Sequence, residues 1–71
     1  MGINTKEAGA IVHCNWPVNG LSYGADYLVK AVRHEVMGPF LIIVNSHTGL
    51  QPEGGSAGYF PWRFTHTGHQ A

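Results

Sequence analysis

Charge is scarce in this chain of 71 residues. Only 11% of the residues are charged, and four basic side chains balance four acidic ones, so the formal net charge at pH 7 is zero. Soluble domains usually carry about 25% charged residues. Without a net field of either sign, the surface has little long-range attraction for polyanions or for an anionic membrane. The composition therefore disfavours binding to nucleic acid and to membranes.

Cysteine and long apolar runs are also nearly absent. Cys14 is the single cysteine, so no disulfide can form within the chain, and this usage fits a reducing cytoplasm. The longest apolar run, residues 39–44, is far shorter than the ~20 residues that cross a bilayer as a helix. The first residues are polar and lack the apolar segment of a secretion signal. We therefore expect a cytoplasmic protein.

Groups suited to catalysis are few. Cys14 follows His13, but neighbouring residues of a strand point to opposite faces, so the thiol and the imidazole cannot pair as nucleophile and base. A buried, unreactive Cys14 is the simpler interpretation. No two carboxylates lie close together in the sequence, and no glycine loop precedes a helix where it could hold phosphate. The sequence predicts neither an enzyme nor a bound cofactor.

Histidine is the most frequent metal-ligand type, with five copies. A structural zinc site needs four converging ligands, commonly supplied as two close pairs. His66 and His69 form the only close pair, while His13, His34 and His47 are scattered. We expect no specific metal site, and only adventitious nickel or zinc at His66 and His69.

Short β-branched and aromatic segments, separated by glycine and proline, predict strands. Residues 10–16 and 40–45 have this pattern, and a last strand pair straddles Pro61, which has no N–H to give to a ladder. Residues 27–36 also fit a helical period through positions 28, 31, 32 and 35. The strand formers Tyr27, Val29 and Val32, and the short flanking loops, favour a strand there.

The predicted architecture is an all-β domain over residues 10–65, with a flexible lead-in over 1–9 and a flexible tail over 66–71. The first connection, residues 18–26, is long. A turn at 46–49 opens a hairpin, and residues 50–57 form a glycine-rich insertion within it. About five short strands favour a small barrel that closes its own edges. The expected core consists of Tyr27, Val29, Ile42, Val44, Tyr59, Phe60 and Phe64.

Several motifs resemble a known family. Cys14-Asn15, Leu21-x-x-Gly24-x-x-Tyr27-x-Val29, Val44-Asn45, Gly49 and Tyr59-Phe60-Pro61-x-x-Phe64 follow one another along the chain. Together they are similar to small SH3-like barrel proteins of tailed bacteriophages and prophages, over about residues 11–64. The chain departs from that pattern at Ala25, where lysine is usual, at Ser46, where aspartate is usual, and in the length of the hairpin. The resemblance implies an SH3-like barrel and an accessory protein that binds and modulates a protein of the bacterial host.

In such a barrel the long first loop lies beside the turn before the last strand. This placement would bring Trp16 and Tyr23 toward Tyr59, Pro61 and Trp62, with Arg63 adjacent, as a shallow aromatic binding surface. The alternative is that Trp16 and Trp62 are lids that cover the ends of the barrel.

Three functions remain open. The favoured one is a non-catalytic protein-binding module whose partner is a host protein or peptide. The second is a single-stranded nucleic-acid binder, in which Trp62, Tyr59 and Trp16 stack on bases while Arg63, Lys30 and Arg33 neutralise phosphates. The third is a homo-oligomeric structural protein, because exposed strand edges and scant charge would permit a homodimer.

Overall fold

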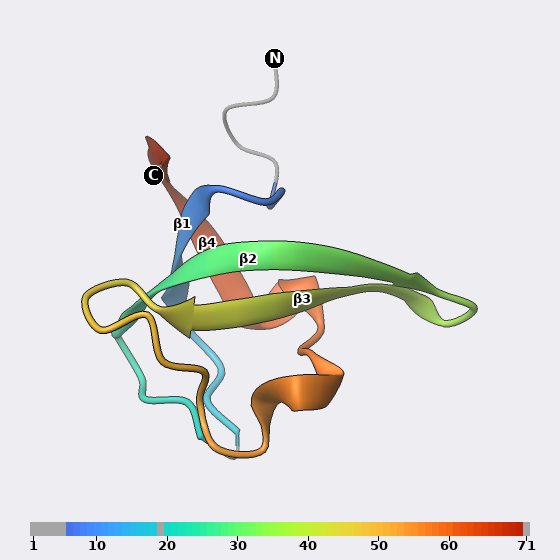
Figure 1. Ribbon diagram of the computed structural model, residues 1–71. Coiled ribbons are helices and arrows are strands. Elements are labelled where there is room, and N and C mark those ends of the chain that lie inside the picture. Colours follow the sequence, from blue (N-terminus) through green and yellow to red (C-terminus); the bar gives the residue numbers. More distant parts are fainter. Residues whose placement is uncertain (1–5, 19, 71) are drawn as a thin grey trace.

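The computed structural model describes residues 6–18 and 20–70 (Figure 1). Within them, four strands form one antiparallel sheet in the order β3-β2-β1-β4. The strands are β1 (Ala10–Cys14), β2 (Asp26–Glu35), β3 (Gly38–Asn45) and β4 (Phe64–Gln70), and two single turns of 3-10 helix, η2 (Gly55–Ala57) and η3 (Pro61–Arg63), lie between β3 and β4. The all-β prediction is confirmed. Residues 1–5 of the expected lead-in, Asn19 and Ala71 lie outside the described residues.

Residues 26–35 are a strand and not a helix, within one residue of the predicted bounds 27–36. β2 is one of the two inner strands: it pairs with β1 through Val12 opposite Tyr27, and with β3 through Val29 opposite Ile43. Because side chains alternate along a strand, Tyr27 and Val29 both face the core and are buried. Pairing of β2 with β1 and with β3 therefore favours the two-residue period of a strand over the 3.6-residue period of a helix.

The hairpin of β2 and β3 is long and extends well beyond β1 and β4, which run steeply across it in the view of Figure 1. The tip of the hairpin carries Val36 and Met37, whose side chains are exposed. A bulge between Val29 and Ala31 interrupts the pairing of β2 with β3. Bulges strengthen the local twist of a sheet. The buried side chains of β2, Tyr27 and Val29, lie in its first half, and the partly buried Val32 packs against the core from beyond the bulge.

Within the described residues ten apolar side chains are buried, and all of them except Val44 pack into one core cluster. The ten are Ala10, Val12, Cys14, Tyr27, Val29, Leu41, Ile43, Val44, Tyr59 and Phe64. Five of the seven expected core residues are among them. Ile42 and Phe60 are only partly buried. Leu41 and Ile43 face the core, so alternation turns Ile42 to the opposite face of β3.

The end of the chain differs from the sequence-based expectation. Where a fifth strand is expected, only Tyr59 pairs, through two backbone hydrogen bonds of 2.8 and 2.9 Å with Leu41. Where a flexible tail is expected from residue 66, β4 continues to Gln70 and pairs with β1, with Val12 opposite His66 and Ile11 opposite His69.

The register of this pairing shifts between Ile11 and Val12, which marks a bulge, and side-chain hydrogen bonds accompany it. The Gly68 amide donates to His66 Nδ1 at 2.7 Å, and the Thr67 hydroxyl donates to the Ile11 carbonyl at 2.8 Å. Local polar contacts of this kind satisfy backbone groups that a bulge removes from the ladder. They explain how a polar, glycine-containing segment forms a strand.

Candidate functional site

Four side chains form a continuous row on the surface, which we call the aromatic–arginine row: Phe40, Phe60, Trp62 and Arg63. The rings of Phe40 and Phe60 meet edge to face with centroids 4.8 Å apart. Phe60 and Trp62 are stacked, with centroids 6.3 Å apart and planes inclined by 15°. The Arg63 guanidinium carbon lies 4.4 Å from the centre of the Trp62 ring, a cation–π distance. The row therefore joins β3 to η3.

The local sequence explains this geometry. Pro61 occupies the first position of η3 and holds the preceding Phe60 in an extended conformation, with φ −64° and ψ 138°. The chain then closes one tight turn, in which the Arg63 amide donates to the Phe60 carbonyl at 3.2 Å. This tight turn keeps Phe60 beside η3, where its ring stacks on Trp62.

Gly58 permits the close approach of this segment to β3. Its φ is +89°, and a Cβ atom there would lie 2.9 Å from Phe40 Cβ and 3.1 Å from Ile42 Cδ1. Only glycine adopts this backbone conformation without strain and leaves room for the Phe40 side chain. Phe40 is not among the binding residues predicted above, and the sequence signal for it is Gly58, two residues before Phe60.

Trp16 is attached to the row through its backbone. The amides of Asn15 and Trp16 both donate to the Arg63 carbonyl, at 2.9 and 3.2 Å, and Arg63 Nη1 donates to the Trp16 carbonyl at 3.1 Å. The Trp16 side chain is 60% exposed and that of Trp62 is 57% exposed. Two large aromatic rings are therefore mainly solvated.

The other residues of the predicted binding surface lie outside the aromatic–arginine row. Tyr59 is 7% exposed and packs edge to face on Phe64, so it belongs to the core. Burial, with a smaller contribution from Tyr27, raises the pKa of the Tyr59 phenol. Pro61 is partly buried at the start of η3. Tyr23 is 74% exposed in the first loop, and among the described residues no ring contact joins it to the row.

A shallow concavity of about 280 Å³ lies beside the row. Apolar groups and backbone form most of its wall, and Arg63 supplies the single charge: the lining residues are Val18, Phe40, Gly54, Gly58, Tyr59, Phe60 and Arg63. Small-molecule sites usually have volumes of about 300–1,000 Å³. The concavity suits one or two side chains of a partner better than a whole ligand.

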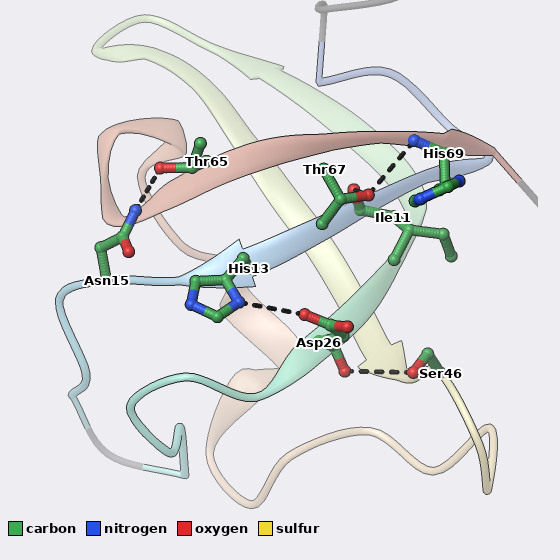
Figure 2. Close-up of polar contacts among 8 residues, drawn as sticks. All are labelled: Ile11, His13, Asn15, Asp26, Ser46, Thr65, Thr67 and His69. Carbon is green, nitrogen blue, oxygen red and sulfur yellow. Dashed lines mark hydrogen bonds and ion pairs between the residues drawn. The ribbon is translucent and has the colours of Figure 1, made fainter.

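Polar side chains of β1, β2, β4 and the adjoining turns contact one another (Figure 2). His13 on β1 contacts the Asp26 carboxylate at 3.1 Å, and both side chains are partly exposed. The Ser46 hydroxyl donates to the Asp26 main-chain carbonyl at 3.2 Å, and the Asn15 amide donates to the Thr65 hydroxyl. Ser46 is therefore engaged with backbone and not with the imidazole, so serine, histidine and aspartate do not form a relay here.

Cys14 faces the core and is fully buried, whereas the adjacent His13 is partly exposed. Burial is the main cause that raises the pKa of the Cys14 thiol, against smaller opposing effects of the Trp16 backbone and Arg63. A thiol in such surroundings stays protonated at neutral pH, and its nucleophilic form, the thiolate, is depleted.

The histidines lie apart from the row. His66 and His69 are both on β4, where His66 Nδ1 already accepts a hydrogen bond from Gly68. In the part of the chain that the structure describes, no group of three or more histidine, cysteine, aspartate or glutamate side chains is placed to hold a metal ion.

Two further findings bear on function. Within residues 6–18 and 20–70, no helix has the length and apolar character that crossing a bilayer requires. No protein-family model matches this sequence, and the chain is matched by no curated protein and by no solved structure.

Proposed function

We propose that this protein is a non-catalytic binding module that recognises a protein partner through the aromatic–arginine row and Trp16. One observation carries the proposal: Trp16 and Trp62 are 60% and 57% exposed although they flank a half-buried Arg63. Tryptophan and arginine are enriched in binding hot spots. Tryptophan supplies a large contact area at a small cost in conformational entropy.

We further propose that the sheet closes into a small SH3-like barrel. The chain leaves one edge of the sheet at Leu41, where Tyr59 pairs, and η3 carries it to the other edge, where β4 pairs with β1. A connection that passes from one edge of a curled sheet to the other supports closure. The family resemblance then suggests a phage or prophage accessory protein that modulates a protein of its bacterial host.

Charge favours a protein partner over single-stranded nucleic acid. Affinity for nucleic acid comes largely from cations that neutralise phosphates. The chain has zero net charge, and Arg33 is already paired with Glu35 at 2.7 Å. Arg63 is thus the one cation on the row, which is too little for a backbone-tracking groove.

Affinity capture from a bacterial lysate tests the proposal. Trp62→Ala is compared with wild type and with Met37→Ala, which removes an exposed apolar side chain from the distant hairpin tip. We expect a partner that wild type and Met37→Ala retain and that Trp62→Ala loses by at least about tenfold, the effect of a 1.4 kcal/mol contact. Equal capture by all three proteins would contradict a binding role for the row.

Two measurements separate the alternatives. A single-stranded oligonucleotide that quenches tryptophan fluorescence at micromolar concentration, and less so at high salt, would favour the nucleic-acid function instead. Light scattering at several protein concentrations would detect a homo-oligomer.

A further inference from the structure

We propose that Arg63 is an anchor for a carboxylate of the partner, so that the module prefers peptides in which an acidic group is flanked by apolar side chains. The inference rests on the proposed function and names the chemistry of its ligand. It follows from the charge, the hydrogen bonds and the surroundings of Arg63.

Arg63 has no acidic partner in the described part of the chain. The two ion pairs there are His13 with Asp26 and Arg33 with Glu35, so no carboxylate lies within 4.0 Å of the Arg63 guanidinium. A half-buried cation without a counter-ion is partly desolvated, and no negative charge balances its own. A carboxylate from a ligand would provide the missing charge.

The guanidinium is held in place before any ligand arrives. It lies over the Trp62 ring at 4.4 Å, and Nη1 donates to the Trp16 carbonyl at 3.1 Å. A guanidinium has five N–H donors in a planar fork, and this contact uses one of them. The remaining donors can bind a carboxylate, and the fixed orientation lowers the entropy lost on binding.

The wall of the adjacent concavity defines what surrounds that carboxylate. No acidic side chain lines it, and Val18, Phe40 and Phe60 supply apolar surface. Glu53 precedes the lining Gly54, but its side chain is exposed and does not contribute to the wall. A partner segment therefore fits when apolar side chains enter the concavity and an acidic side chain or a free C-terminal carboxylate reaches Arg63.

Fluorescence anisotropy with four labelled peptide pools tests this preference. Three pools have the form Ser-X-X-Z-X-Ser with an amidated end, where X is an equal mixture of leucine, proline and tyrosine, and Z is glutamate, glutamine or lysine. A fourth pool ends directly at X with a free carboxylate and distinguishes the C-terminal source from the side-chain source. Each pool is titrated with wild type, Arg63→Gln, Arg63→Lys and Arg33→Gln.

We expect wild type to bind the glutamate pool or the free-carboxylate pool about tenfold more tightly than the glutamine pool, as a charge-assisted contact implies. Arg63→Gln should lose that preference and Arg63→Lys most of it, whereas Arg33→Gln should keep it, because Glu35 already pairs with Arg33. Circular dichroism of each variant verifies that it is folded.

Equal affinity for the glutamate, glutamine and free-carboxylate pools would overturn the inference, as would a preference that survives in Arg63→Gln or the absence of binding by every pool at millimolar concentration. None of these results would remove the proposed function, which is decided by the capture experiment with Trp62→Ala.

Discussion

Trp16 and Arg63 are hydrogen-bonded in both directions across the end of β1. The Trp16 amide donates to the Arg63 carbonyl at 3.2 Å, and the Arg63 guanidinium donates to the Trp16 carbonyl at 3.1 Å. Residues 47 positions apart in the sequence are thereby held together. One arginine side chain thus fastens the first loop to η3, the two segments that carry the exposed tryptophans.

These contacts of Arg63 predict that Arg63→Ala is less stable than wild type. The variant loses one hydrogen bond from a charged donor and one cation–π contact, which together contribute about 1–2 kcal/mol. Urea unfolding should show a loss of that size. Arg33→Ala is the control and should lose under about 1 kcal/mol, because exposed ion pairs contribute little. Equal losses would show that the link to Trp16 adds no stability.

Gly58→Ala should be more damaging than an equivalent change elsewhere. A Cβ at Gly58 meets Phe40 Cβ at 2.9 Å in addition to the strain of φ +89°. The expected loss is about 3 kcal/mol or more. Gly24 has a similar φ of +80° with no atom within 4 Å of its Cβ position, so Gly24→Ala measures the backbone strain alone, about 1–2 kcal/mol. Thermal unfolding of both variants tests the difference.

Trp62→Ala and Phe64→Ala distinguish a contact residue from a lid. Trp62 is 57% exposed and Phe64 is 2% exposed. Removing a buried phenylalanine loses about 3–5 kcal/mol, most of the stability of a small domain. Trp62→Ala should lose about 1 kcal/mol or less, since its ring is largely solvated. A loss as large as that of Phe64→Ala would identify Trp62 as a lid.

His66→Ala should loosen the end of β4. His66 Nδ1 accepts the Gly68 amide at 2.7 Å, and alanine leaves this N–H without that acceptor. The expected loss is about 1 kcal/mol, with faster hydrogen exchange at the amides of Gly68 and His69. His69→Ala keeps the His66 contact and is the matched control. Unchanged exchange at Gly68 in His66→Ala would contradict a structural role for the imidazole.

Stability should fall at alkaline pH. Burial raises the pKa of Cys14 above its ordinary 9.0 and that of Tyr59 above its ordinary 10.0, so the folded state holds both protons more tightly than the unfolded state. This contribution is fully present below about pH 9 and is lost as the pH rises through the folded-state values. The urea midpoint should therefore fall from pH 8 to pH 11, and less steeply in Cys14→Ala. A midpoint that rises over this range would contradict the assignment.

The local sequence pattern predicts much of the fold. The segments predicted as strands at 10–16 and 40–45 form strands over 10–14 and 38–45. The segment predicted at 27–36 forms a strand over 26–35, although a helical period competes there. Local pattern fails where strand formation depends on a partner. Residues 64–70 contain two histidines, two threonines and a glycine, yet pairing with β1 and the contacts of His66 and Thr67 make them a strand.

The residues of the candidate site are likewise predictable only in part from local pattern. Aromatic content and the proline at position 61 identify residues 59–63 from the sequence. Of the two residues assigned to the core there, Tyr59 is buried as expected, whereas Phe60 is only partly buried and stacks on Trp62. Phe40 joins the row only because Gly58 lets two distant segments approach closely.

The sequence by itself determines that this protein is a small all-β domain with little charge and spare aromatic side chains, because hydrophobic alternation and turn residues act over a few positions. Only the tertiary structure decides which aromatics are spare and that Arg63 has no acidic partner within the described residues. Burial and ion pairing are properties of residues brought together from distant positions, and no local pattern encodes those distances.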